Sequence, residues 1–149
     1  MIECIRFGIR TLIGSALVAL FTASGIADDV VSCPDTITVK QKLAQPVSGW
    51  TEGSDELPNR FASVTFYAGP PEQKASLANQ GETHSKGRDY ATWNFGSETG
   101  NRIWIACGYA GTNIVLSHPL AKGVSRCTVT YNPRQSIAGL PLIERIVCK

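Results

Sequence analysis

The chain has 149 residues, 43% of them hydrophobic, and a formal net charge of +2 that comes from 14 basic and 12 acidic residues. The length suits one domain. Its basic residues are scattered singly, so the sequence lacks the clustered positive charge of a nucleic-acid-binding domain, and we expect no nucleic acid among its partners.

The amino-terminal segment 1–27 has the three parts of a secretory signal peptide. Arg6 and Arg10 precede 17 residues without charge that end at Ala27, and small residues at positions 25 and 27 suit cleavage there. A retained membrane anchor would need about 20 predominantly apolar residues, whereas several residues of this stretch are small or hydroxylated. The sequence therefore predicts export to the periplasm or the outside of the cell. It also predicts one mature domain, residues 28–149, that is not held in a membrane.

A lipid anchor on Cys33 is the alternative, because residues 30–33 superficially resemble the box that precedes a lipoprotein cysteine. Two aspartates separate this box from the apolar segment, however, and Pro34 follows the cysteine directly. Lipidation would also leave an odd number of thiols in the mature chain. We therefore predict that Cys33 carries no lipid.

The mature chain keeps four of the five cysteines, with 12 basic and 11 acidic residues, because the signal segment takes away one cysteine, two arginines and one glutamate. The four are Cys33, Cys107, Cys127 and Cys148. An even number of cysteines in a small exported domain predicts a disulfide framework, here of two bridges.

Alternation of apolar and polar residues, rich in Val, Ile, Thr and aromatic side chains, predicts a mostly β domain. The predicted strands are Thr36–Leu43, Phe61–Tyr67, Tyr90–Phe95, Arg102–Tyr109, Asn113–Ser117, Cys127–Tyr131 and Leu142–Cys148. One short helix is predicted over 71–79, because Pro71 suits a first helical position and Gly81 follows a run of helix formers. The expected fold class is an antiparallel sheet, or a small sandwich or barrel, with one short helix and two disulfides.

Three segments between the predicted elements read as loops. Residues 47–60 and 80–89 are polar and are expected to be flexible, and residues 132–139 are expected to connect the last two strands.

The disulfide pairing can be argued from the strand order. If residues 102–131 form a three-stranded meander, Cys107 and Cys127 lie on its outer strands, roughly 9–10 Å apart, beyond the Cα separation of about 7 Å that a disulfide spans. Antiparallel pairing of the last two strands places Cys127 opposite Cys148. The sequence therefore favours Cys127–Cys148 with Cys33–Cys107, and the alternative is Cys107–Cys127 with Cys33–Cys148.

Two histidines could act as general bases, since imidazole titrates near neutral pH. His84 has Ser85 and Asp89 near it in sequence, but adjacency does not make a catalytic triad, and no Gly-x-Ser-x-Gly motif is present. We expect His84 in a solvated loop and His118 at a strand end, and we predict no catalytic residue.

The sequence also lacks the ligand sets of common metal sites. Two distant histidines and oxidised cysteines do not form a zinc site. The acidic cluster of Glu52, Asp55 and Glu56 lacks the alternating pattern of a calcium loop. We therefore predict neither a metal site nor a cofactor.

Aromatic side chains are the remaining candidates for binding. Most are expected in the core, because aromatic residues pack well on half-buried sheets, although Trp and Tyr also anchor interfaces. Trp50 lies in a segment with two glycines between strands, so it is expected to be exposed. Together with Trp93 and Tyr90 it forms the candidate binding surface.

Several segments resemble those of a family of small exported proteobacterial proteins of unassigned function. They are the Cys33-Pro34 start, the segment Val64–Pro71, and the closing motifs C-x-V-T-Y at 127–131 and I-x-x-I-x-C at 143–148. The resemblance covers nearly the whole mature chain. It implies an exported, disulfide-linked β domain and identifies no catalytic residue.

The lack of visible chemistry favours a binding protein over an enzyme. A small, rigid, disulfide-linked domain loses little conformational entropy on binding. This suits a protein partner in the cell envelope, with the chain as an inhibitor or immunity factor of an envelope enzyme. Two alternatives stay open: a small-ligand or glycan-binding module that uses exposed aromatic rings, and a hydrolase that uses His84 or His118. The oligomeric state is also left open.

Overall fold

A computed structural model describes residues 29–53, 57–96 and 102–149. The predicted signal peptide, residues 1–27, lies outside the described residues. Within the described ranges, no helix is long and apolar enough to cross a membrane.

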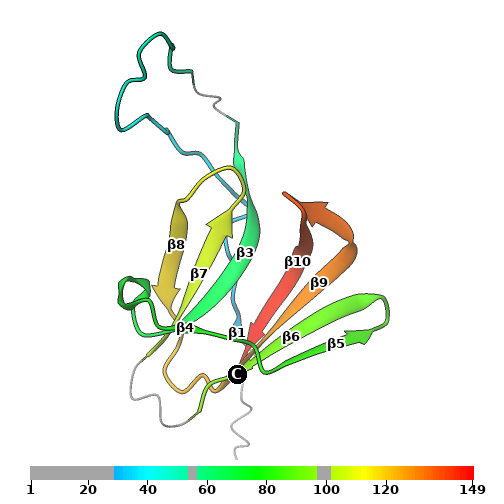
Figure 1. Ribbon diagram of the computed structural model, residues 1–149. Coiled ribbons are helices and arrows are strands. Elements are labelled where there is room, and N and C mark those ends of the chain that lie inside the picture. Colours follow the sequence, from blue (N-terminus) through cyan, green and yellow to red (C-terminus); the bar gives the residue numbers. More distant parts are fainter. Residues whose placement is uncertain (1–28, 54–56, 97–101) are drawn as a thin grey trace, which may run out of the picture.

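Two antiparallel sheets make up the described part of the chain (Figure 1). The first has the order β1-β10-β9-β6-β5 and consists of β1 (Asp29–Val30), β10 (Leu140–Cys148), β9 (Arg126–Ile137), β6 (Arg88–Asn94) and β5 (Gly81–Ser85). The second has the order β2-β3-β7-β8, with β4 also on β3, and consists of β2 (Thr36–Ile37), β3 (Asn59–Ala68), β7 (Ile103–Tyr109), β8 (Val115–Pro119) and β4 (Ser76–Leu77). The expected mostly β class is confirmed, and the sheets do not close into a barrel.

The two sheets share one hydrophobic core. Phe66 of β3 is fully buried, and its ring centroid lies 5.1 Å from that of Trp93 on β6 and 5.5 Å from that of Phe95. Ile105 on β7 and Val129 on β9, from opposite sheets, are also fully buried. Because successive side chains of a strand point to opposite faces, one face of each sheet supplies this core.

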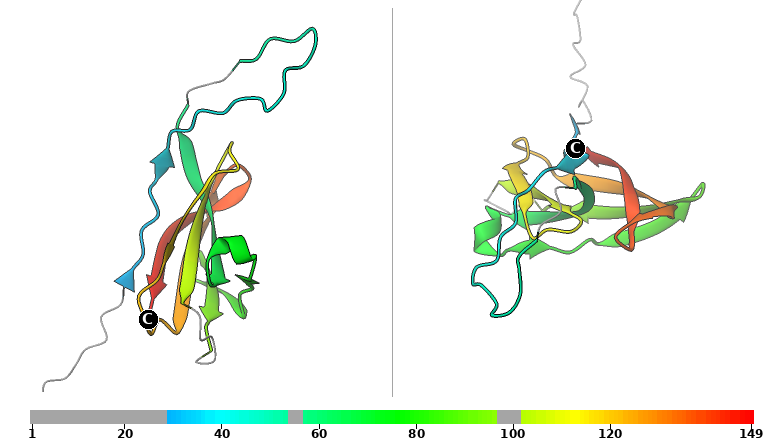
Figure 2. Two further views of the ribbon diagram at one scale, coloured as in Figure 1. Left: turned by 90° about the vertical axis from the view of Figure 1, so that its left-hand side faces the viewer. Right: turned by 90° about the horizontal axis from the view of Figure 1, so that it is seen from above.

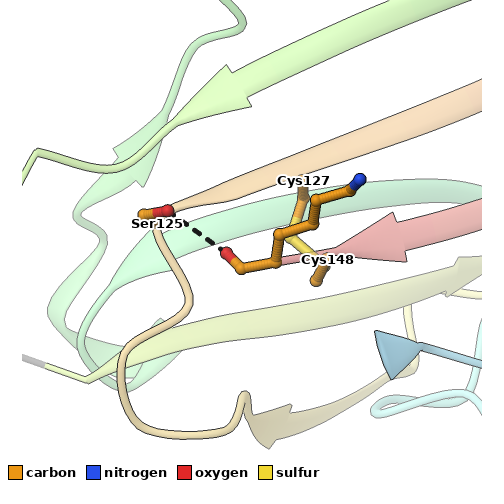
Figure 3. The surroundings of a disulfide bond; sticks show 4 residues. Ser125, Cys127 and Cys148 are labelled. Atoms are coloured by element: carbon orange, nitrogen blue, oxygen red, sulfur yellow. Dashed lines mark hydrogen bonds between the residues drawn. A yellow bond between two sulfur atoms is a disulfide. The ribbon is translucent and has the colours of Figure 1, made fainter. Parts of the chain in front are cut away.

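Two disulfides join Cys33 to Cys107 and Cys127 to Cys148, the pairs that the sequence favours. Cys127 and Cys148 are direct partners across β9 and β10, with a Cα–Cα distance of 4.1 Å (Figure 3). This short spacing is that of a non-hydrogen-bonded antiparallel pair, whose side chains meet most closely. The Ser125 hydroxyl donates to the Lys149 carbonyl at 3.3 Å, so the chain is also held beyond the bridge.

The three-stranded meander expected over 102–131 is wrong. β8 pairs with β7, but β9 lies in the other sheet, between β10 and β6. Leu120 is 2% exposed, and its amide donates to the Ile103 carbonyl at 2.8 Å, so the chain is anchored in the core as it passes from one sheet to the other. Cys107 and Cys127 are therefore kept apart by lying in different sheets.

The helix expected over 71–79 is also wrong. Only a 3₁₀ turn forms, η1 (Pro71–Gln73), and Lys74 ends it with φ of 57°. Leu77 then pairs with Phe66 in β4 and packs against the core. A two-turn helix gains little from propensity alone, whereas the strand pairing buries an apolar side chain.

Two-residue turns replace two of the expected loops. Lys86 and Gly87, with φ of 50° and 72°, close the β5–β6 hairpin over residues 80–89. Ala138 and Gly139, with φ of 52° and 81°, close the β9–β10 hairpin, so most of the expected 132–139 loop is strand. Positive φ at both central positions is the geometry that a tight hairpin requires, and glycine adopts it at no steric cost.

The strand expected over Thr36–Leu43 ends after Ile37. Residues 38–53 and 57–58, on the connection back to β3, lie outside the strands (Figure 2). Residues 54–56 of this connection lie outside the described ranges. The connection extends beyond the ends of the neighbouring strands in Figure 1 and in the left view of Figure 2.

Candidate functional site

The connection between β2 and β3 carries large apolar side chains on the outside of the molecule. Four of them form what we call the loop surface: Leu43, Val47, Trp50 and Leu57. Trp50 has 82% of its surface exposed and Leu57 has 73%. Exposed apolar groups gathered in one place, rather than scattered singly, mark an interaction site.

Hydrogen bonds fix the loop surface on the second sheet. The Gln41 side-chain amide donates to the Gly111 carbonyl at 2.9 Å, which ties the loop to the turn after β7. The Leu43 amide donates to the Glu52 carboxylate at 2.8 Å, across the loop. A cavity of about 800 Å³ lies between the loop and this turn. Glu52 is thus a partner of the loop backbone, and the other two acids of its cluster, Asp55 and Glu56, lie outside the described residues.

A second surface lies on the first sheet, at its edge strand β5 and the neighbouring strands β6 and β9. A cavity of about 590 Å³ is lined by Glu82 and His84 of β5, Asp89 of β6 and Tyr131 of β9, among others. We call it the polar cavity.

The strand register shows why these four side chains meet. His84 pairs with Asp89, and Asp89 pairs with Tyr131, so the three form a row across β5, β6 and β9. Glu82 heads the next row, opposite the buried Ala91. Direct partners share a face, so the polar cavity continues the face that carries the core.

Polar contacts organise the cavity. The Nδ1 atom of His84 lies 2.6 Å from Oδ1 of Asp89. The Asn79 side-chain amide donates to Oε1 of Glu82 at 2.9 Å. Burial, and secondarily the charge of Glu82, raises the pKa of Tyr131 above its usual value near 10. The phenol of Tyr131 therefore stays protonated at neutral pH.

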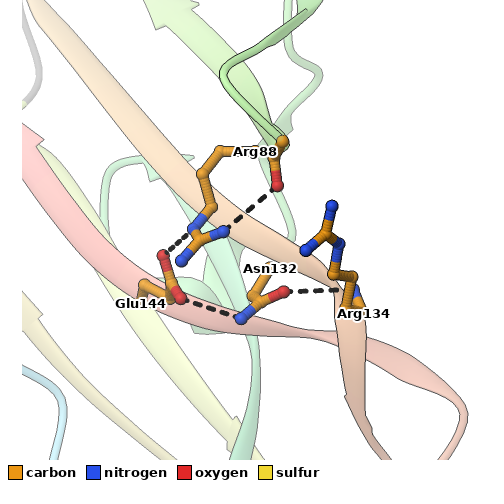
Figure 4. A network of polar contacts seen from close by, with 5 residues as sticks. Arg88, Asn132, Arg134 and Glu144 are labelled. Atoms are coloured by element: carbon orange, nitrogen blue, oxygen red, sulfur yellow. Dashed lines mark hydrogen bonds and ion pairs between the residues drawn. The ribbon is translucent and has the colours of Figure 1, made fainter.

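A separate network holds the strands around the polar cavity (Figure 4). Asn132 is 8% exposed and donates to Oε1 of Glu144 at 3.0 Å, while it accepts from the Arg134 amide at 3.0 Å. The Arg88 guanidinium donates to Oε2 of Glu144 and to the Gly87 carbonyl. β10 has a register shift between Ile143 and Arg145, and this network pins the extra residue, Glu144, to β9 and to the β5–β6 turn. The network thus fixes the position of the hairpin that carries His84 and Asp89.

The polar cavity offers binding groups rather than an evident reaction. An imidazole oriented by a carboxylate can act as a base, as His84 and Asp89 could. The described lining of the cavity contains neither serine nor cysteine as a nucleophile, and its threonine, Thr83, lies on the opposite face of β5 from His84. His118 lies on β8 in the other sheet, with its Nδ1 3.0 Å from the Pro119 carbonyl oxygen. Among the described residues, no three His, Cys, Asp or Glu side chains gather closely enough to hold a metal ion.

The three aromatic residues predicted to form one binding surface are not brought together. Trp50 belongs to the loop surface, whereas Trp93 and Tyr90 line the polar cavity. Trp93 is 7% exposed and donates its indole N–H to the Leu77 carbonyl at 3.0 Å, so it is mainly a core residue. Its ring is therefore largely unavailable to a partner.

Sequence reasoning also missed the residues that make the polar cavity. His84 was expected in a flexible loop, Asp89 was considered only as its neighbour in sequence, and Glu82 and Tyr131 were not singled out. Gly87 was the available signal, because a glycine between two alternating segments suits the positive φ of a tight hairpin turn.

The described part is a disulfide-linked domain of two antiparallel sheets with two candidate binding surfaces. Its sequence matches the model of the Type VI secretion system Tli immunity protein family over residues 54–149, which is 96 of the 149 residues. The chain belongs to this family. The match includes β3 to β10, and hence the polar cavity, whereas most of the loop surface precedes it.

The chain is also similar to a curated protein of Azospirillum brasilense, described as an uncharacterized 16.3 kDa protein in the trpG 5' region. The two are 28% identical over 130 residues, which are 82% of this chain and 85% of the relative. No solved structure matches the chain significantly.

Proposed function

We propose that this chain is an exported, non-catalytic immunity protein, which binds an effector of a type VI secretion system in the periplasm and blocks its action on the cell envelope. The observation that carries the proposal is the family match over residues 54–149. The family description implies a protein partner, and the structure has two candidate surfaces that could bind one.

Two features support the periplasm as its location. Both disulfides are formed, and disulfides persist in oxidising compartments such as the periplasm. The amino-terminal 27 residues have the charge and length pattern of a secretory signal. An immunity protein placed there meets an effector in the compartment from which the effector would act on the envelope.

The loop surface is the part of the molecule that we expect to anchor the effector. Interface anchors are enriched in tryptophan and lie in contacts that exclude water. Trp50 is a large exposed ring, flanked by Leu43, Val47 and Leu57, on a connection that protrudes from the sheets. A partner with an apolar recess would bury all four side chains together.

Competition between strains tests the function. A strain of the source bacterium that lacks this chain should lose viability beside its parent when the type VI apparatus of the parent is intact, and should survive beside a parent without that apparatus. A plasmid copy of the chain should restore survival. Equal survival of the deletion strain beside both parents would contradict the immunity role.

The loop surface is tested in the same assay. Trp50→Ala should abolish rescue, because truncation of a central aromatic anchor weakens binding by about 2 kcal/mol or more. Leu140→Ala is the matched control, since Leu140 is also an exposed apolar residue, 47% exposed, but lies at the β9–β10 turn. It should rescue like the parent chain. Full rescue by Trp50→Ala at parental protein levels would show that the effector docks elsewhere.

A further inference from the structure

We propose that the polar cavity is a binding site for a guanidinium group, as an arginine side chain carries it. That the arginine belongs to the effector rests on the proposed function, whereas binding of the group itself does not. The site would then be a second contact with the effector, one that recognises positive charge, in addition to the apolar loop surface.

The charge of the lining selects a cation. The lining includes two carboxylates, Glu82 and Asp89, and no lysine or arginine. Within the described ranges, no lysine or arginine forms an ion pair with either carboxylate, and His84 is the one side chain that pairs with Asp89. An incoming cation therefore meets negative charge that the chain itself leaves largely uncompensated.

Each of the two carboxylates has an oxygen that could accept hydrogen bonds from a guanidinium group. Asn79 occupies Oε1 of Glu82 and His84 occupies Oδ1 of Asp89. In the described part of the chain, no hydrogen bond reaches the second oxygen of either carboxylate. The two acids are diagonal neighbours across β5 and β6, a relation that places Cα atoms about 7–8 Å apart. A guanidinium has five N–H donors in one plane, so it can bridge two such acceptors.

The aromatic lining favours guanidinium over a compact ammonium ion. Tyr131 shares the cavity face with Asp89, whereas Tyr90 lies on the opposite face of β6 and Trp93 is mainly buried. Guanidinium stacks on aromatic rings and is more weakly hydrated than ammonium, so it loses less when it enters a partly buried site. A divalent metal is a poor candidate, because no three metal-binding side chains of the described ranges lie close enough together.

The position of the cavity is a further argument. The face that carries His84, Asp89 and Glu82 is the one that buries Ala91 and Val129 further along the same sheet. Inner positions of packed sheets are ordinarily apolar. At the polar cavity this face is instead uncovered: the side chains of His84 and Asp89 are 63% and 43% exposed, so a ligand can reach the carboxylates from solvent.

Nuclear magnetic resonance of the disulfide-bonded protein, labelled with ¹⁵N, tests the proposal without the effector. N-acetyl-arginine methylamide is the probe, and the citrulline and lysine analogues are the controls. Citrulline has nearly the same shape without the charge. The arginine probe should shift the amide resonances of β5, β6 and the Tyr131 region in a saturable way. Both controls should bind with an affinity at least about tenfold lower.

A pair of double variants assigns the site. Glu82→Gln with Asp89→Asn should weaken binding of the arginine probe by about tenfold or more, because each lost acceptor was charged. Asp35→Asn with Glu72→Gln removes the same charge outside both candidate surfaces and should leave the affinity unchanged. Unsaturable or scattered shifts, equal binding of the citrulline or lysine analogue, or equal loss in both double variants would overturn the proposal.

The strain competition separates this proposal from the proposed function. If Glu82→Gln with Asp89→Asn loses probe binding but still rescues the deletion strain, the immunity role stands, the guanidinium site stands, and the arginine is not from the effector. If the deletion strain needs no rescue, the probe titration still decides the site.

Discussion

Trp93 and Trp50 show how differently one residue type is used in two regions of this molecule. Trp93 is 7% exposed, packs at a tilt against Phe66 and satisfies its indole N–H inside the protein. Trp50 is 82% exposed on a connection that lies outside the sheets. Burial of a large ring stabilises the fold, whereas an exposed ring retains its apolar surface for a partner. The comparison predicts that stability and binding can be removed separately.

Truncation of the two tryptophans should give the largest contrast. Trp93→Ala should lower the free energy of unfolding by about 3–5 kcal/mol, because it leaves a cavity in the core. Trp50→Ala should change it by less than about 0.5 kcal/mol. Urea unfolding followed by circular dichroism measures both. Similar losses in the two variants would show that Trp50 also packs into the fold.

Removal of the Cys127–Cys148 bridge tests whether stability can be lowered locally, within the first sheet. Replacement of both cysteines by alanine should lower the free energy of unfolding by about 2–4 kcal/mol. Amide hydrogen exchange should become faster first in β10, since the bridge joins it directly to β9. A uniform increase in exchange over both sheets would contradict a local role of the bridge.

The smallest expected effect concerns Tyr131, at the border between the core and the polar cavity. Its pKa is raised in the folded state, mainly by burial. The contribution of the protonated phenol to the free energy of unfolding is therefore complete below about pH 10. It is lost as the pH rises through the folded-state pKa, because the unfolded chain releases this proton first. Tyr131→Phe should make the free energy of unfolding fall less steeply above about pH 10. An unchanged slope would show that the phenol is not desolvated.

Much of the fold could be predicted because the sheets follow local rules. Alternating residues marked seven strands, and the opposition of Cys127 and Cys148 follows from the antiparallel register of the last two strands. What could not be predicted was non-local. The assignment of β9 to the other sheet depends on how Leu120 buries, and nothing in residues 120–125 distinguishes a crossover from a hairpin.

The candidate sites divide in the same way. Exposure of Trp50 followed from its place between strands, beside a turn glycine, Gly49. The polar cavity was missed because His84 and Asp89 were assigned to a loop, where side chains have no register. Once Lys86 and Gly87 are recognised as a tight turn, the two residues become cross-strand partners. Tertiary pairing also overrode the helix formers of 71–79, as marginal local propensities permit.

The two bridges have a consequence for biosynthesis under the export proposed above. A chain that crosses a membrane from its amino terminus presents its cysteines in sequence, first Cys33, then Cys107, Cys127 and Cys148. The native bridges join the first to the second and the third to the fourth. An oxidase that links each new thiol to the free one before it therefore makes the native pairs directly. The protein should mature without the slow disulfide reshuffling that takes seconds to hours.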